Sequence, residues 1–334
     1  MRVVVDAMGG DRAPAVVVEG AVQAARELGV EIVLVGRQEA IEAELARFET
    51  TGLPLTIRHA SQVIAMDEHN PAAAVKTQKN SSMVVSMDLL KRRDADALLT
   101  AGHSGAALAA ALFRLGRIRG IKRPALSTIF PSDTPQGHCF LLDIGANAVC
   151  KPEYLLQFAI MGCVYAERVL GVPNPRLAIV SNGEEEGKGN DLVQETTPLL
   201  RASGLNFVGN AEGKDIPWGL ADVVVTDGFT GNVILKLAEG VSKFLMDVLK
   251  ENIMSSSVAK VGGMLAKPAF DAVRQRLDYR EYGGAPLLGV DGVVIVGHGR
   301  SDALAIKNGV RVAAQAVENG ILEAIKDGIA EYEG

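Results

Sequence analysis

The segment SNGEEEGKGND, residues 181–191, places three consecutive carboxylates between two glycines and follows them with a lysine. The glycine spacing differs from that of a P-loop, and Gly189 stands where a Ser or Thr would bind magnesium. Adjacent glutamates cannot all point to one centre, so a metal site is disfavoured, and we expect neither a metal nor an organic cofactor. Lys188 precedes a predicted helix start, where a cation beside free amides suits phosphate or a developing oxyanion. The alternative is a surface lysine paired with a neighbouring glutamate.

Five further turns combine glycine with short polar residues after an apolar run. They cover residues 6–11, 100–105, 143–147, 226–232 and 297–302. Each turn by itself is also explained by the chemistry of tight turns and helix caps. Together, free helix-start amides at the carboxyl edge of a sheet would form an anion-binding surface. We therefore expect these loops and Lys188 to meet along a single rim of the sheet.

Alternating elements must position these loops. Short runs rich in Val, Ile and Leu are each followed by a turn and a segment with helical spacing, a pattern typical of βα units. The predicted strands cover residues 2–6, 31–36, 54–59, 95–100, 125–130, 138–143, 176–181, 205–209, 222–226 and 292–297. Continuous apolar runs favour a sheet covered on both faces, so the predicted fold class is α/β, a doubly wound, mostly parallel αβα sheet. Residues 251–290 interrupt this rhythm and indicate an insertion or a domain edge.

Composition limits the classes of function. The chain has 334 residues, 48% of them hydrophobic and 22% charged, as expected for a folded protein with a large core. A net charge of −6 and an aromatic content of 4% argue against a nucleic-acid partner. Three widely spaced cysteines, Cys139, Cys150 and Cys163, fit neither a disulfide framework nor a metal clip, which favours a cytoplasmic location. No stretch reaches the roughly 18 apolar residues of a spanning helix.

Several polar side chains in the glycine turns are candidates for proton transfer or oxyanion binding. Asp227 ends an apolar run, where it could orient a lysine or accept a proton, and Asn232 could donate to a phosphate or carbonyl oxygen. Both are equally explained as helix-cap residues. His103 and His298 lie in glycine turns, so a simple turn hydrogen bond is the alternative to a catalytic role.

Two other segments indicate partner surfaces. Five cations fall within ten residues that contain no acid: Arg114, Arg117, Arg119, Lys122 and Arg123. This run suits an acidic partner, or else a solvated helix end. From residue 241, apolar side chains at helical spacing predict contact with the core or with a dimer partner. The apolar and basic segment around Pro268 fits a bilayer surface, an acyl channel or a dimer contact.

Seven motifs, read together and in order, carry a family resemblance. They are DAMGGD (6–11), AGHSGA (101–106), LDIGAN (142–147), NGEEEGKGN (182–190), FVGNAEGKDI (207–216), DGFTGNVILK (227–236) and YGGAPLLG (282–289). In this order they resemble the phosphate acyltransferase (PlsX) family of bacterial phospholipid synthesis. The chain departs from the family pattern at His103 and Ser104, where AGNTGA is usual, and at Val149, where Asp is frequent.

The resemblance implies transfer of a fatty acyl group from acyl carrier protein to inorganic phosphate, which yields acyl phosphate. It also implies a homodimer with an isocitrate or isopropylmalate dehydrogenase-like fold, in the cytoplasm and peripherally attached to the membrane. A membrane acyl-phosphate:glycerol-3-phosphate acyltransferase is the implied downstream partner. We expect one catalytic unit over residues 1–334, with a first lobe of 1–125 plus 283–334. The second lobe would be 126–282, with an irregular helical insertion at about 251–282.

Residues and reaction combine into a predicted mechanism. Phosphate is largely dianionic near neutral pH, so it needs positioning more than it needs a base. The predicted phosphate-binding residues are Gly9, Gly10, His103, Ser104 and Gly105. Lys188 or Asn232 would stabilise the tetrahedral oxyanion, Asp227 would support them, and His298 or His103 would protonate the leaving thiolate. The cation run at residues 114–123 would dock the acidic carrier protein.

Two other functions remain open at this stage. The first is an NAD(P)-dependent oxidative decarboxylase of the same fold, which would need a nicotinamide cofactor and a divalent metal. The second is a non-catalytic scaffold that binds a phosphorylated metabolite and tethers lipid enzymes to the membrane.

Overall fold

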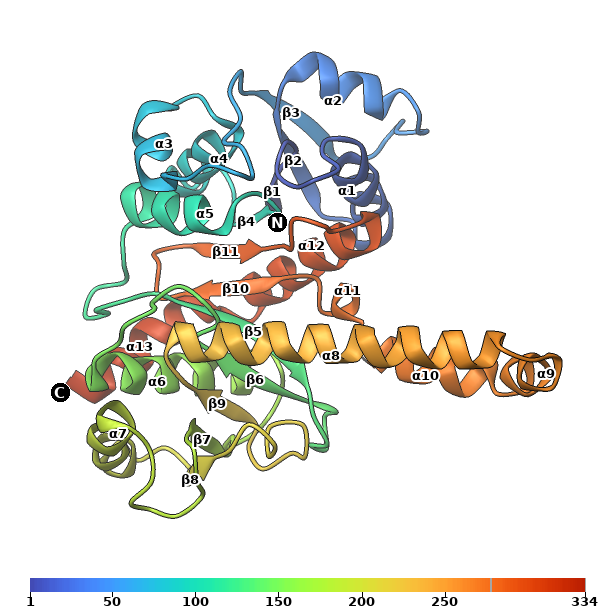
Figure 1. The fold of residues 1–334 in the computed structure, drawn as a ribbon. Helices are drawn as coiled ribbons and strands as arrows, with labels where there is room; N and C mark the ends of the chain where they lie inside the picture. Colours follow the sequence, from blue (N-terminus) through green and yellow to red (C-terminus); the bar gives the residue numbers. More distant parts are fainter. Residues whose placement is uncertain (277, 334) are drawn as a thin grey trace.

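A computed structural model describes residues 1–276 and 278–333 of the chain. Its centre is one 11-stranded sheet with the order β3-β2-β1-β4-β11-β10-β5-β6-β9-β7-β8. Helices pack on both faces of this sheet, and one long helix, α8, leaves the body of the molecule (Figure 1). The α/β prediction, with helices covering both faces of a mostly parallel sheet, is therefore confirmed.

The ten predicted strands form, with ends shifted by at most two residues. They are β1 (Arg2–Asp6), β2 (Glu31–Gly36), β3 (Leu55–His59), β4 (Ala97–Thr100), β5 (Ala125–Pro131), β6 (His138–Leu142), β7 (Leu177–Val180), β8 (Phe207–Ala211), β9 (Val223–Val225) and β11 (Val293–Val296). An eleventh strand, β10 (Ala285–Leu288), was not predicted. Its sequence Ala-Pro-Leu-Leu follows two glycines and is short, so it has the local pattern of a turn. Pairing with β11 and β5 on either side makes it a strand.

Helices follow most of the strands along the chain. They are α1 (Ala15–Leu28), α2 (Gln38–Leu45), α3 (Pro71–Thr77), α4 (Ser82–Lys91), α5 (Ser104–Ala110), the π-helical turn η1 (Ala111–Leu115), α6 (Pro152–Arg168), α7 (Asp191–Ala202), α11 (Tyr279–Tyr282), α12 (Ala303–Glu318) and α13 (Ile321–Glu333). Alternate strand residues face opposite sides of the sheet, so Val3 and Val5 pack beneath α1 and α12 while Val4 packs beneath α4. The start of α8 covers the second half of the sheet on the same side as α4.

Strand direction separates the glycine loops into two sets. β1, β2, β3, β4 and β11 run parallel to one another, and β6, β7, β8 and β9 also form a parallel set. Three consecutive antiparallel pairings, β11 with β10, β10 with β5, and β5 with β6, lie between the sets. Three reversals invert the direction, so the carboxyl ends of the two sets lie at opposite edges of the sheet. The expectation of a single rim is therefore wrong.

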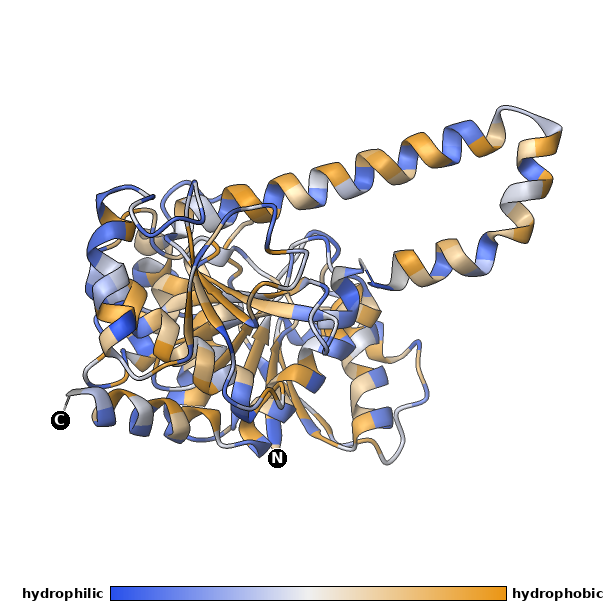
Figure 2. Ribbon diagram, turned by 90° about the horizontal axis from the view of Figure 1, so that it is seen from below, coloured by the Kyte–Doolittle hydropathy of each residue, from blue (hydrophilic) through white to orange (hydrophobic). Residues whose placement is uncertain are grey.

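A helical arm projects from the body. It consists of α8 (Gly228–Met254), α9 (Ser257–Leu265) and α10 (Lys267–Arg276), with α9 at the tip and α10 returning toward the body (Figure 2). Many apolar side chains of the arm are exposed, among them Leu237, Phe244, Val258 and Leu265. Within the described residues, no helix is both long and apolar enough to cross a bilayer. The division into two lobes stays a prediction.

Candidate functional site

A cavity of about 1070 Å³ lies beside α8. Its apolar lining includes Leu126, Phe130, Leu235 and Met246. Its polar lining comes from both sheet edges and from the root of the arm, and includes Asp11, Ser104, Asn232, Lys236, Glu239, Lys243, Asp278, Arg280, His298, Arg300, Ser301 and Asp302. Because α8 starts at one edge of the sheet and runs toward the other, it joins loops that strand direction separates.

The first rim is the edge formed by the carboxyl ends of β1, β4 and β11. Asp6 and Thr100 are buried side by side, and the Thr100 hydroxyl donates to Asp6 Oδ2 at 2.8 Å. The same hydroxyl oxygen accepts from the Gly102 amide at 3.1 Å. A Cβ at Gly9 would lie 2.6 Å from the Gly102 nitrogen, so only glycine permits these loops to approach. Burial raises the pKa of the Asp6 carboxyl.

The predicted phosphate-binding residues all lie at this first rim, and Ser104 lines the cavity. Gly10 packs against the Gly299 carbonyl, which places it behind the turn that follows β11. Two of the amides donate within their own loops: Gly9 to the Asp6 carbonyl at 3.3 Å and Gly105 to His103 Nδ1 at 3.0 Å. His103 therefore acts as the N-cap of α5. Its imidazole nitrogen accepts the hydrogen bonds that the side-chain oxygen of an Asn would accept at this position.

The second rim is the edge formed by the carboxyl ends of β6, β7 and β9. Asp143 is fully buried there and accepts from the amides of Gly145, Ala146 and Asn147 at 2.7–3.0 Å. The Asn147 side chain at 2.9 Å and the Leu126 amide at 3.1 Å complete the set. Burial nevertheless raises the pKa of the Asp143 carboxyl. A Cβ at Gly231 would lie 1.9 Å from the Asp143 carbonyl oxygen, so α8 starts in direct contact with this loop.

Of the two predicted residues at the start of α8, Asp227 caps the helix and Asn232 lines the cavity. Asp227 is the N-cap, accepting from the Thr230 amide at 2.9 Å and from the Thr230 hydroxyl at 2.7 Å. This geometry matches the capping alternative for Asp227. Asn232, one turn further on, lines the cavity. The structure thus brings Asn232 and His298, from opposite edges, to the same cavity.

Lys188 lies elsewhere. It is exposed in the loop after β7, where its amide donates to the Glu185 carbonyl at 3.0 Å and its side chain lies along Gly183. It is not among the residues that line the cavity. Glu186 pairs with Arg201. In the described ranges 1–276 and 278–333, no group of three or more His, Cys, Asp or Glu side chains could hold a metal ion.

His298 lies in a cluster of charged groups. Burial lowers its pKa below the ordinary value, and the positive charges of Arg300 and Lys236 lower it further, while Glu239 and Asp11 act in the opposite direction. Glu239 Oε2 lies 3.5 Å from Arg300 Nη2 and 3.2 Å from Lys236 Nζ. This arrangement favours a neutral imidazole at physiological pH.

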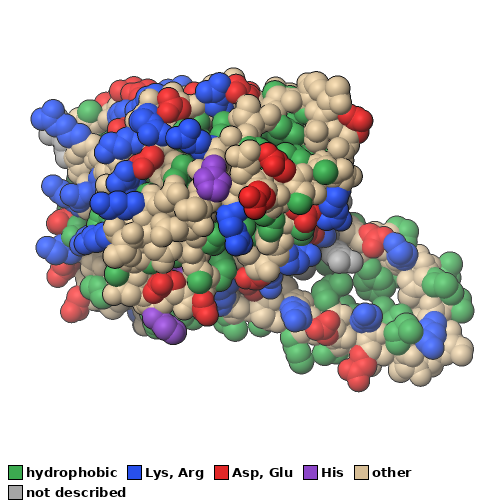
Figure 3. All heavy atoms as spheres, turned by 90° about the horizontal axis from the view of Figure 1, so that it is seen from above, with side chains coloured by type: hydrophobic (Ala, Val, Ile, Leu, Met, Phe, Trp, Pro, Cys, Tyr) green, Lys and Arg blue, Asp and Glu red, His purple; other side chains and the backbone are tan. Residues whose placement is uncertain are grey.

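The five-cation run follows α5 and η1. Arg114 is held by Asp88 through two bonds of 2.6 Å, and Arg117 donates to the Lys122 carbonyl. Arg119, Lys122 and Arg123 are exposed, and Arg123 lies over the Tyr154 ring. The segment descends on the left of Figure 1, and Figure 3 shows Lys and Arg side chains gathered on that side, away from the arm.

Sequence reasoning missed Lys236, Glu239, Arg300 and the arginine at the root of the arm, Arg280. Two signals were available. Arg300 lies in a turn already selected for its glycines, and Lys236 follows Asn232 by four residues, which places both on one helix face. No local pattern marks Glu239 or Arg280.

Comparison with known proteins gives the family. A model of the family described as "Fatty acid synthesis protein" matches residues 1–324. The chain is 50% identical over 333 residues to a phosphate acyltransferase from Pelotomaculum thermopropionicum, covering 100% of this chain and 96% of the relative. It is 51% identical over 330 residues to one from Dictyoglomus turgidum, covering 98% of each chain.

Solved structures share the fold at low identity. A phosphotransacetylase from Streptococcus pyogenes matches with a TM-score of 0.63 at 18% identity, over 95% of this chain and 94% of that one. A 4-hydroxythreonine-4-phosphate dehydrogenase from Klebsiella pneumoniae matches with a TM-score of 0.52 at 14% identity, over 95% of this chain and 98% of that one. These structural matches show the fold alone. The sequence matches decide the family, because the chain is identical to phosphate acyltransferases at half of its positions over nearly its full length. This chain therefore belongs to the phosphate acyltransferase (PlsX) family.

Proposed function

We propose that this chain transfers a fatty acyl group from acyl carrier protein to inorganic phosphate and forms acyl phosphate for phospholipid synthesis. The observation that carries the proposal is full-length similarity to phosphate acyltransferases. Acyl transfer to phosphate follows from membership of that family. The carrier protein as the donor, and the use of the product in phospholipid synthesis, are the proposed parts.

The cavity supplies what this reaction needs. A phosphate oxygen attacks the thioester carbonyl carbon, and the tetrahedral intermediate then expels the thiolate as the carbon–sulfur bond breaks. Phosphate, with a second pKa of about 6 to 7, is already nucleophilic near neutrality, so catalysis rests on holding it against the carbonyl. The cavity combines cations at Lys236 and Arg300 with apolar walls from Phe130 and Met246, which suit an anion and an acyl chain side by side.

We assign roles in this scheme to two of the predicted catalytic side chains. Asn232 lines the cavity and can donate its side-chain amide to the developing oxyanion. Neutral His298 can hydrogen-bond phosphate, and it can pass a proton to the thiolate only after taking one up from a substrate. Ser104 remains our candidate phosphate contact at the first rim. Lys188 and Asp227 have no support from the cavity.

Docking of the acidic carrier protein is proposed at Arg117, Arg119, Lys122 and Arg123. Arg114 is already neutralised by Asp88, so we assign it to holding η1 in place. These four cations follow directly on α5 and η1, the helical segment Ser104–Leu115 that begins at Ser104. A donor bound there could direct its acyl group toward the cavity.

Homodimer formation and membrane contact are proposed for the arm. On α8 the side chains of Val233, Leu237, Phe244 and Val248 form an exposed apolar stripe, which supports pairing with a second copy. At the tip, apolar side chains and lysines are exposed together, a combination that suits an anionic bilayer surface. These residues are Met254, Val258, Val261, Met264, Leu265, Lys260 and Lys267.

One assay tests the function. Purified full-length protein is incubated with acyl-carrier thioester, with and without inorganic phosphate, and free thiol is measured. We expect thiol release only when phosphate is present, with no loss of rate in EDTA and no reduction of NAD(P). Release that is absent, or that does not depend on phosphate, overturns the proposal. Cofactor reduction would favour the oxidative decarboxylase instead.

A further inference from the structure

We propose that Arg300 and Lys236 bind the acceptor phosphate, and that Glu239 is the counter-ion which phosphate displaces from them. This inference rests on the proposed function for the identity of the anion as the acceptor. The site itself rests on the geometry of the cavity, where one cation comes from each half of the sheet.

The two cations meet at one carboxylate oxygen. Arg300 follows β11 at the first rim, and Lys236 lies two turns into α8, which starts at the second rim. Both point to Glu239 Oε2, at 3.5 Å and 3.2 Å. An oxygen shared by a guanidinium and an ammonium marks the position that a phosphate oxygen would take. The site therefore joins loops that lie at opposite edges of the sheet.

Phosphate can displace the Glu239 carboxylate from the two cations. The side chains of Lys236 and Arg300 are 54% and 49% exposed, so water screens their ion pairs with Glu239 and keeps them weak. Phosphate carries about 1.5 to 2 negative charges near neutrality and has more acceptor oxygens than one carboxylate. It can therefore replace Glu239 between the two cations. In the resting protein, Glu239 lowers the attraction of the site for other anions.

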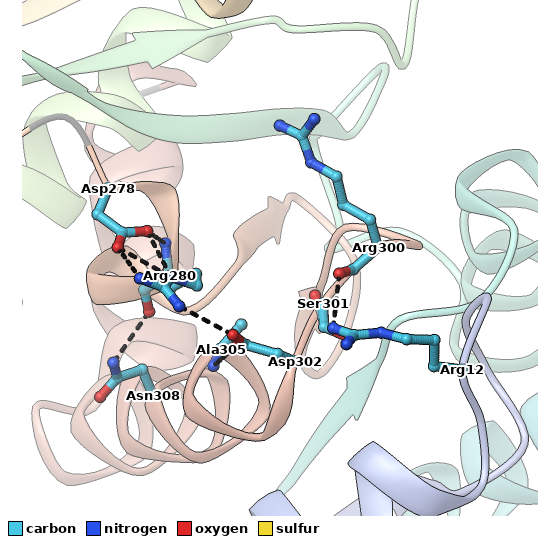
Figure 4. Close-up of polar contacts among 8 residues, drawn as sticks. All are labelled: Arg12, Asp278, Arg280, Arg300, Ser301, Asp302, Ala305 and Asn308. Carbon is cyan, nitrogen blue, oxygen red and sulfur yellow. Dashed lines mark hydrogen bonds and ion pairs between the residues drawn. The ribbon is translucent and has the colours of Figure 1, made fainter. Parts of the chain in front are cut away.

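The backbone that carries Arg300 is held from both sides (Figure 4). Arg12 Nη2 donates to the carbonyls of Arg300 at 3.3 Å and Ser301 at 3.1 Å, and the Asp11 amide donates to the Gly299 carbonyl at 2.8 Å. On the other side, Arg280 Nη1 donates to Asp302 Oδ2 at 3.0 Å. In Figure 4 the Arg300 side chain points away from Arg12, toward the strand behind it. A fixed backbone reduces the entropy lost when the side chain binds an anion.

The location favours a small anion over a protein carboxylate. The cations line a concave cavity together with Ser104 and His298, whereas the exposed Arg117, Arg119, Lys122 and Arg123 form the surface that suits an acidic protein. A phosphate group could come from free inorganic phosphate or from a phosphodiester carried by the donor. Both share the same oxyanion chemistry, so the experiment must separate them.

The experiment measures the KM for inorganic phosphate, the KM for acyl-carrier donor, and the shift in Tm caused by inorganic phosphate alone. Arg300→Gln should raise the phosphate KM about tenfold or more, and Lys236→Gln about fivefold, since each removes a charged donor. Glu239→Gln should lower the phosphate KM about threefold, because it removes a negative charge beside the bound anion. Donor KM should change less than twofold in all three variants.

Lys250→Gln is the matched control, because it removes the same charge from α8 outside the cavity lining and should leave all three quantities unchanged. Arg300→Lys keeps the charge and should recover part of the affinity. An unchanged phosphate KM and Tm shift in both Arg300→Gln and Lys236→Gln overturns the site. A rise confined to the donor KM also overturns it and assigns the cations to the donor. A higher phosphate KM in Glu239→Gln refutes displacement.

The experiment distinguishes failure of the anion site from failure of the proposed function. If wild-type protein forms no acyl phosphate, yet its phosphate-dependent Tm shift is lost in Arg300→Gln and Lys236→Gln, the anion site stands and the reaction is wrong. If those variants form acyl phosphate with the wild-type KM for phosphate, the reaction stands and this site is wrong.

Discussion

Each rim of the sheet has a buried aspartate at the end of a strand, but the two aspartates differ in how many hydrogen bonds they accept and from which segments. At the first rim, buried Asp6 is bonded to the Thr100 hydroxyl of the neighbouring strand and to the Met8 amide. At the second, buried Asp143 accepts from five N–H groups, four of them in its own loop. The second rim is thus rigid by itself, whereas the loops of the first rim depend on one another.

This difference fits the position of each rim relative to the cavity. The second rim anchors α8, so any movement there would displace the whole wall of the cavity. The first rim carries Ser104 on one loop and His298 and Arg300 on another, and all three face the cavity. The loop that must aim a helix is therefore held by its own bonds, whereas the loops that face the ligand are held by bonds to one another and to other segments.

The largest expected effect is on the anchor of α8. In Gly231→Ala the new Cβ would lie 1.9 Å from the Asp143 carbonyl oxygen, so the helix start must shift. We expect the free energy of unfolding to fall by about 3 kcal/mol, measured by urea denaturation. Gly240→Ala, in the same helix, is the control, because a Cβ at Gly240 would have nothing within 4 Å. Its free energy of unfolding should rise by about 0.5–1 kcal/mol. Equal stability of the two variants would refute the anchor.

The next comparison is between the two aspartate networks. Asp143→Asn replaces an accepting oxygen by an NH2 group that faces other N–H donors and cannot accept their hydrogen bonds. The free energy of unfolding should fall by about 2–3 kcal/mol. Thr100→Val removes the hydroxyl between Asp6 and the Gly102 amide and should cost about 1–2 kcal/mol. Thermal and urea unfolding give both values. A larger loss in Thr100→Val than in Asp143→Asn would reverse our ranking of the two rims.

A smaller effect is expected at the helix caps. Asp227 at the second rim is bonded locally to Thr230, but Asp302 at the first rim is bonded to Arg280 from the root of the arm. Arg280→Gln should therefore lower stability by about 1 kcal/mol and speed proteolysis of the arm. Thr230→Val should produce a similar or smaller loss of stability without that change in proteolysis. Identical proteolysis of the two variants would show that Arg280 does not hold the arm.

The smallest effect concerns pH. The pKa of His298 is lowered from 6.5 by burial and then by Arg300 and Lys236, so the unfolded chain binds a proton more readily than the folded one. Its contribution to stability is therefore present above about pH 6.5 and is lost as the pH falls through the folded-state pKa. Arg300→Gln should raise the pKa of His298 toward its ordinary value, as seen by NMR titration of the histidine ring. A further decrease would contradict the clustering of these charges.

Much of the fold could be predicted because the signal is local. Runs such as RVVVD and EIVLVG are apolar along their whole length, and they form strands wherever they are paired. The glycine turns were also found, because the approach of Gly9 to Gly102 and of Gly231 to Asp143 demands a residue without a side chain. Ser104, Asn232 and His298 reach the cavity as candidates chosen on residue type alone.

The sequence by itself determined where strands, turns and helix starts occur, since these depend on neighbouring residues and on periods of two or 3.6. Only the tertiary structure decided the relative direction of the two strand sets, because the pairing of β10 with β5, which joins them, brings together residues far apart in the chain, Leu287 with Leu126. That choice placed Lys188 and the first-rim loops at opposite edges. It also made α8 cross the sheet, so that Lys236 and Arg300, 64 positions apart in the numbering, share one carboxylate.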